Sequence, residues 1–134
     1  MKILGVEHVA IAAESLEEGA PFWRDILGIP HGGIEILESE GVSTHIYDTG
    51  KGKIELLVRH GDDSPISKFL KKRGPALHHV CLEVEDIASA VEELKEKGIR
   101  LINDVPRQGV GGYSVAFVHP ESTGGILVEL CQKS

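Results

Sequence analysis

Two stretches of this chain, His8-Val-Ala-Ile-Ala-Ala13 and His79-Val-Cys-Leu-Glu-Val84, are alike and lie 71 residues apart. In each, a histidine leads an apolar run of the kind that forms a β-strand. Similarity at a fixed offset indicates that the chain contains the same supersecondary unit twice. The elements that follow each histidine define that unit.

A helix is predicted after each of these strands. Ser15 with Glu18 forms a helix-capping pattern, and Asp86 is a suitable cap in the second half. Gly28 and Gly98 end the two helical segments. Apolar residues recur at three- to four-residue spacing, which predicts one buried face on each helix. The residues on these faces, including a core tryptophan, are Leu16, Ala20, Trp23, Ile26 and Leu27, then Ile87, Val91 and Leu94.

Three strand-like segments follow each helix, separated by glycine-rich or polar turns. They cover about residues 31–38, 42–49 and 53–59, then about 100–104, 113–119 and 125–131. Each half is therefore predicted to be a βαβββ module, at about residues 1–62 and 75–134 of a single domain. Between the modules, Ser64-Pro65 opens a linker helix at 64–73, because serine caps helices and proline favours their first turn.

Composition excludes several functional classes. The 134 residues are 41% hydrophobic and 26% charged, as expected for one soluble globular domain. A formal charge of −7 argues against nucleic-acid binding, and no apolar run is long enough to span a membrane. The N-terminus lacks the pattern of a signal peptide, so we expect a cytoplasmic protein. Cys81 and Cys131 lie in apolar runs and are expected to be small buried thiols.

One carboxylate stands among aliphatic residues in the last strand of each half. These residues are Glu55 in the first half and Glu129 in the second. A buried carboxylate is costly unless it is paired or binds a metal. Together with His8 and His79, the two glutamates make a repeated set of two nitrogens and two oxygens. Such a set suits one divalent ion with open positions for a substrate, such as Mn, Co, Ni, Fe(II) or Zn.

At these residues the sequence resembles the vicinal-oxygen-chelate (glyoxalase/bleomycin-resistance/dioxygenase) superfamily. Three stretches, at residues 63–74, 77–80 and 119–130, resemble the methylmalonyl-CoA epimerases within it. The resemblance implies an α+β fold in which two tandem βαβββ modules form a curled, partly open eight-stranded mixed sheet. It also implies that the metal ligands are His8, Glu55, His79 and Glu129.

The implied reaction interconverts (2R)- and (2S)-methylmalonyl-CoA through an enolate, and therefore needs a proton carrier on each face of C2. Glu129 is the expected carrier on one face. Some epimerases have a second glutamate where this chain has Thr44, and threonine is a poor base. The second carrier is then a water, His45, or a nearby glutamate such as Glu38 or Glu40. Ser122 is the expected hydrogen-bond donor to the coenzyme A part of the substrate, although Glu121 stands where relatives often have lysine.

Other interpretations stay open at this point. Glyoxalase I (lactoylglutathione lyase) shares the fold and a similar metal site, and its substrate is a glutathione hemithioacetal. A metal-free small-molecule-binding protein of the same fold is the second alternative. The sequence leaves open the identity of the metal, the thioester carrier and the oligomeric state. A homodimer is one of the allowed states, because Ile3, Leu4 and Val6 form an apolar strand edge.

Overall fold

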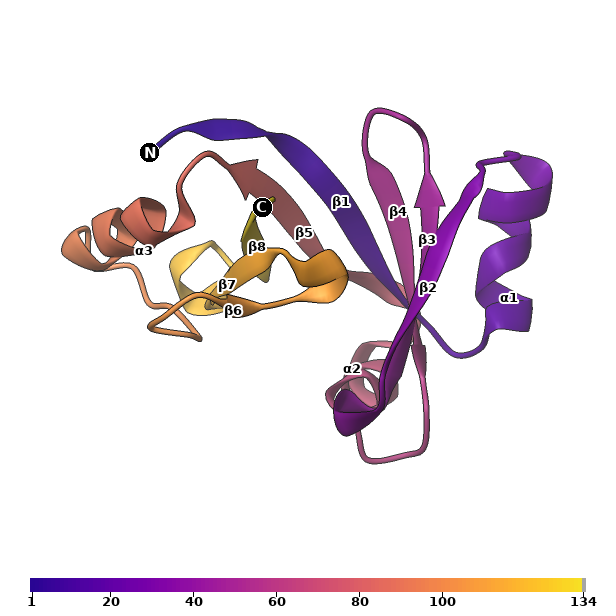
Figure 1. The fold of residues 1–134 in the computed structure, drawn as a ribbon. Coiled ribbons are helices and arrows are strands. Elements are labelled where there is room, and N and C mark those ends of the chain that lie inside the picture. Colours follow the sequence, from indigo (N-terminus) through magenta and orange to yellow (C-terminus); the bar gives the residue numbers. More distant parts are fainter. Residues whose placement is uncertain (134) are drawn as a thin grey trace. The chain divides into compact units, whose positions relative to one another are not determined.

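The computed structural model describes residues 1–133. Eight strands hydrogen-bond in the order β2-β3-β4-β1-β5-β8-β7-β6, with parallel and antiparallel neighbours (Figure 1). This confirms the predicted eight-stranded mixed sheet. The strands are β1 (Ile3–Ala13), β2 (His31–Leu37), β3 (Val42–Asp48), β4 (Lys53–Arg59), β5 (Ala76–Val84), β6 (Arg107–Gln108), β7 (Ser114–Val118) and β8 (Val128–Gln132). The helices are α1 (Leu16–Pro21), α2 (Pro65–Arg73) and α3 (Ile87–Glu96).

The chain divides into two compact units. The first unit is His8–His78, and the second combines Met1–Glu7 with His79–Ser134. The chain therefore crosses from one unit to the other inside β1, at His8, and inside β5, at His79. The predicted division into modules at about residues 1–62 and 75–134 remains a prediction.

In the first unit, both faces of the sheet are covered by a helix. Residues of α1 pack with Tyr47 and Leu56 on one face. Residues of α2 pack with Ala10 and Leu57 on the other face. Side chains alternate between the two faces along each strand. The register therefore assigns the residues of β3 and β4, of β1 from His8 onward and of β2 from Gly33 onward to the α1 face or the α2 face.

In the second unit, α3 covers one face of the sheet. Its residues Ile87 and Val91 pack with Val84, Ala116 and Leu130. The opposite face contains a smaller cluster, formed by Cys81, Val115 and Cys131 with Tyr113 packed against it.

The predicted helix caps are present. The Ser15 hydroxyl accepts a hydrogen bond from the Glu18 amide at 3.2 Å, and the Asp86 carboxylate accepts one from the Ser89 amide at 3.1 Å. Ser64 caps α2 in the same way, and Pro65 is the first residue of that helix. Each cap satisfies an amide that has no partner inside its own helix.

Two details of the prediction are wrong. Residues 100–104 form no strand; only Leu101 bridges to Val118 there, and the short β6 lies further on. Asn103-Asp104 favour a turn and Pro106 lacks a donor, which ends the pairing. The second error concerns the first helix, which widens to a π-helical turn, Phe22–Ile26, after Pro21.

That change of helix geometry alters which side chains are buried. Ile26 is 74% exposed and Leu27 is 51% exposed, although both were expected on the buried face. Trp23 does pack against the core cluster of Ala20, Tyr47 and Leu56. Among the described residues, no helix has the length and apolar character needed to cross a membrane.

Candidate metal centre

The first unit contains a buried pair formed by His8 and Glu55. In the parallel ladder of β1 and β4, Glu55 lies beside Ala10, two residues beyond His8. Residues two apart in a strand point to the same face, so both side chains lie on the α2 face. The Nδ1 atom of His8 is 3.2 Å from Oε2 of Glu55.

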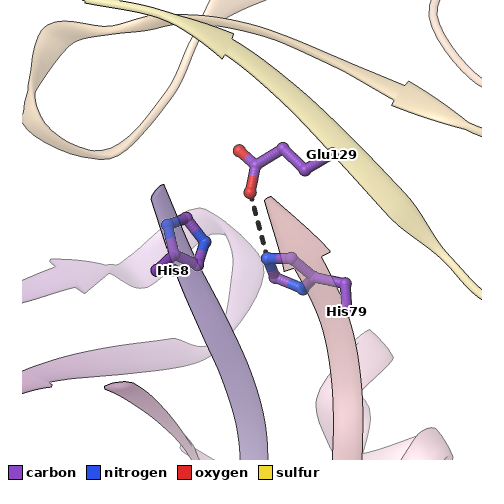
Figure 2. Close-up of side chains that lie close together, drawn as sticks. All are labelled: His8, His79 and Glu129. Carbon is purple, nitrogen blue, oxygen red and sulfur yellow. Dashed lines mark ion pairs between the residues drawn. The ribbon is translucent and has the colours of Figure 1, made fainter. Parts of the chain in front are cut away.

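The second unit repeats this arrangement with His79 and Glu129. In the parallel ladder of β5 and β8, Glu129 lies beside Cys81, again two residues beyond the histidine. The Nε2 atom of His79 is 3.0 Å from Oε1 of Glu129, drawn as a dashed line in Figure 2. The Phe117 ring contacts the His79 ring edge-on, with centroids 5.6 Å apart. The duplication seen in the sequence is therefore also a duplication of geometry.

Burial makes these two pairs unusual. All four side chains belong to residues between 4 and 8% exposed. A carboxylate removed from water in this way needs a compensating positive charge or strong hydrogen bonds. A neutral imidazole supplies each carboxylate with one hydrogen bond, whereas a bound cation would also supply positive charge.

The donor set fits a divalent ion. Bonds of about 2.1 Å to neighbouring octahedral positions place two ligand atoms about 3.0 Å apart. The nitrogen-to-oxygen separations of 3.2 and 3.0 Å within the two pairs agree with that value. Each unit thus presents one nitrogen and one oxygen at the spacing that two ligands of one ion would have.

The two residues proposed from β3 lie on opposite faces of the sheet. Ile46 lies beside Glu55 and Thr44 beside Leu57, so Thr44 shares the α2 face with Glu55. His45 lies beside Leu56 and points to the α1 face. This placement does not support His45 as a proton carrier in the site that Glu55 faces. The reason is that side chains alternate along a strand. The sequence alone does not show which face of β3 matches the face of the metal ligands, because that depends on the pairing of β3 with β4.

His45 is engaged on its own face. Its Nε2 atom is 3.2 Å from the Ser43 hydroxyl, and both residues are buried. Burial lowers the pKa of His45, and the nearby imidazoles of His31 and His60 lower it further. His45 is therefore interpreted as a neutral core histidine whose ring forms a hydrogen bond with Ser43.

Ser122 lies in a 3₁₀ turn, Pro120–Ser122. Its hydroxyl accepts a hydrogen bond from the Arg100 amide at 2.9 Å, and the Arg100 guanidinium pairs with Glu121 at 2.6 Å. A hydroxyl that accepts one hydrogen bond can still donate its own hydrogen. The carboxylate of Glu121 forms an exposed ion pair with Arg100.

Both cysteines are free and buried, as predicted. A hydrogen bond with Cys131, followed by burial, raises the pKa of the Cys81 thiol far above its usual range. Because the thiolate is the reactive form, Cys81 is an inert packing residue. It lies beside Glu129 in the ladder of β5 and β8.

The sequence did not single out two carboxylates that the structure brings forward. Glu7 is 5% exposed, and its carboxylate pairs with the Lys133 ammonium at 2.9 Å within the second unit. Glu35 on β2 lies directly beside Thr44 on β3. The alternating pattern of β2 predicts that Glu35 shares a face with Leu37. Only the registers of β2 with β3 and of β3 with β4 show that Glu55 projects from the same face.

Comparison with known proteins agrees with this architecture. A profile of the Glyoxalase/Bleomycin resistance protein/Dioxygenase superfamily matches residues 7–117, and the chain belongs to this superfamily. The predicted glyoxalase-like fold class is thereby confirmed.

Several of the similar proteins are named as epimerases. Mitochondrial methylmalonyl-CoA epimerase of Mus musculus is 43% identical over 132 residues, which are 98% of this chain and 74% of that protein. Ethylmalonyl-CoA/methylmalonyl-CoA epimerase of Cereibacter sphaeroides is 42% identical over 95% of this chain and 96% of that protein. A solved methylmalonyl-CoA epimerase in complex with methylmalonyl-CoA and NH4+ is 28% identical, with a TM-score of 0.91 over 99% of this chain and 96% of that one.

Proposed function

We propose that this chain is a divalent-metal-dependent epimerase that interconverts (2R)- and (2S)-methylmalonyl-CoA. The observation that carries the proposal is the repeated buried pair, His8 with Glu55 and His79 with Glu129, each at ligand spacing. The similarity to methylmalonyl-CoA epimerases over nearly the whole chain supports the choice of substrate.

In this proposal the four residues hold one ion. The chain crosses between its two units at His8 and at His79, so each histidine stands at a covalent junction of the units. Sharing one cation would compensate both buried carboxylates at once. The ion, of unspecified identity, would act as a Lewis acid that stabilises negative charge on the thioester oxygen.

The chain's own residues then carry out the proton chemistry. A carboxylate removes the C2 proton, the C–H electron pair moves into the enolate, and a proton returns to the opposite face of C2. Glu129 is the proposed carrier on one face. Its burial among apolar strands keeps bulk water from competing for the proton.

The substrate is proposed to be an acyl-CoA thioester, with the Ser122 hydroxyl donating a hydrogen bond to its coenzyme A part. The Arg100–Glu121 pair cancels charge at this turn, so recognition there would depend on hydrogen bonds more than on ionic attraction. A cytoplasmic location and a homodimeric state also remain proposals from the sequence.

The deciding experiment supplies one epimer of methylmalonyl-CoA to the metal-loaded protein in heavy water. The proposal predicts that deuterium enters C2 and that the opposite epimer accumulates. The hemithioacetal of methylglyoxal and glutathione serves as the competing substrate. Consumption of the hemithioacetal without exchange at C2 of methylmalonyl-CoA would instead identify a glyoxalase. Absence of both reactions would favour a binding protein.

A further inference from the structure

The proposed reaction requires two proton carriers, and the strand register of the first unit constrains where the second one lies. It is expected on the α2 face, because Glu55, the carboxylate that this unit contributes to the proposed metal centre, projects from that face. Thr44 lies on the correct face but is 2% exposed and has no group that titrates near neutral pH. His45 lies on the wrong face.

The two acidic alternatives beside β2 are also poorly placed. Glu38 and Glu40 belong to the 3₁₀ turn Glu38–Glu40, and both are exposed. A carboxylate in that turn is outside the strands that present the α2 face. It would also remain in water, where proton transfer to a bound substrate gains nothing from positioning.

Among the described residues of β2 to β4, the carboxylates on the α2 face are Glu35, Asp48 and Glu55. Glu7, on the part of β1 that belongs to the second unit, pairs with the Lys133 ammonium. Glu55 belongs to the candidate metal centre. Asp48 accepts a hydrogen bond from the Gly50 amide at 2.8 Å and so holds the turn that connects β3 to β4. Glu35 remains, at the middle of β2 and half-buried.

Glu35 also lies where a carboxylate at position 44 would be needed. It is the direct register partner of Thr44 on the neighbouring strand. Directly opposed residues have Cβ atoms about 5 Å apart, within the reach of a glutamate side chain.

The separation from the metal centre suits a substrate between them. Glu35 is two strands and one two-residue step from Glu55, which corresponds to roughly 12 Å between Cα atoms for ordinary strand spacing. Both side chains project from the same face, so the acyl group of a substrate held at the proposed ion would lie between the two carboxylates. Half-burial of Glu35 leaves it accessible to a ligand that enters from solvent.

We propose that Glu35 is the second catalytic proton carrier of this enzyme, replacing the carboxylate that Thr44 lacks. In one direction Glu129 takes the C2 proton, the electron pair forms the enolate, and the carboxylic acid of Glu35 protonates the other face. In the reverse direction the roles exchange. The inference rests on the proposed epimerase function.

The test compares Glu35→Gln with Glu38→Gln, a matched change of an exposed glutamate three residues away. Each variant receives the two epimers separately in heavy water. We expect Glu35→Gln to lose epimerisation by about 10²- to 10⁴-fold, the usual contribution of a positioned acid or base. It should still exchange the C2 hydrogen of the one epimer that Glu129 deprotonates. Glu38→Gln should resemble the wild type.

Other outcomes overturn the inference. Near-normal epimerisation by Glu35→Gln would exclude Glu35 as a carrier, and equal loss of exchange from both epimers would indicate a structural role. The double variant Glu35→Gln/Thr44→Glu should epimerise the substrate at least tenfold faster than Glu35→Gln, because position 44 lies on the same α2 face as position 35. A wild-type protein without activity on methylmalonyl-CoA would instead refute the proposed function, and this inference with it.

Discussion

The Nε2 atom of His79 lies 3.0 Å from Oε1 of Glu129, and both side chains are almost fully buried. The parallel register of β5 and β8 fixes this contact, because it sets Glu129 beside the residue two positions after His79. A carboxylate in this position can ligate a cation through one oxygen and accept a proton on the other. A variant that keeps the shape of the side chain but cannot accept a proton should therefore lose turnover while it still binds the metal.

Glu129→Gln is expected to lower kcat by about 10²- to 10⁴-fold, because the amide cannot accept a proton as a carboxylate does. The amide oxygen remains available as a ligand, so metal content should fall much less. Metal analysis and C2 exchange rates measure the two effects. Glu121→Gln, which alters an exposed pair with Arg100, is the control. If Glu129→Gln retained near-full turnover, Glu129 would not be a proton carrier.

The stability of the protein should depend on His45 below pH 6.5. Burial lowers the pKa of His45 in the folded protein, while in the unfolded chain it stays near the ordinary value of 6.5. The unfolded state therefore binds the proton first, and the contribution to stability is complete above pH 6.5 and declines as the pH falls toward the lowered folded-state pKa.

The variant His45→Gln can keep a hydrogen bond to Ser43 but does not titrate. Its free energy of unfolding should fall less than that of the wild type between pH 7 and pH 5, measured by urea denaturation. Catalytic turnover should stay close to the wild-type value, because His45 faces α1. Parallel pH curves for the two proteins would contradict the depressed pKa.

Alanine substitutions at two glycines with similar backbone conformations distinguish the cost of backbone strain from the cost of steric overlap. Gly28 has φ +66° and Gly41 has φ +61°. A Cβ at position 28 meets nothing within 4 Å, whereas one at position 41 would lie 2.8 Å from Cβ of Ser64. Gly28→Ala should cost about 1–2 kcal/mol for the left-handed conformation alone. Gly41→Ala should cost roughly 1–3 kcal/mol more, and equal losses in urea denaturation would contradict the close approach.

The sequence predicted the features that depend on local patterns. His8 and His79 were predicted as candidate ligands because they recur in the two halves. Glu55 and Glu129 were predicted because a carboxylate among aliphatic residues is costly to bury without a partner. Helix caps such as Ser15 were predictable for the same reason, because their hydrogen bonds are made within one turn.

Features that depend on register were not predictable. Adjacent residues Thr44 and His45 differ only in the face they occupy, and that difference comes from pairing with β4. Glu35 becomes a candidate proton carrier only because the register places it beside Thr44. The exposure of Ile26 follows from the π-helical turn after Pro21, which a regular helical period does not anticipate.

The two histidine–glutamate pairs are proposed to share one ion, and the metal stoichiometry of single variants distinguishes one shared site from two separate sites. The wild type should bind one divalent ion per chain after dialysis. His8→Ala and His79→Ala should each abolish that binding, although each variant leaves the other pair intact, whereas His60→Ala, at an exposed histidine, should not. Two ions per chain, or a full ion retained by either His8→Ala or His79→Ala, would contradict the shared site.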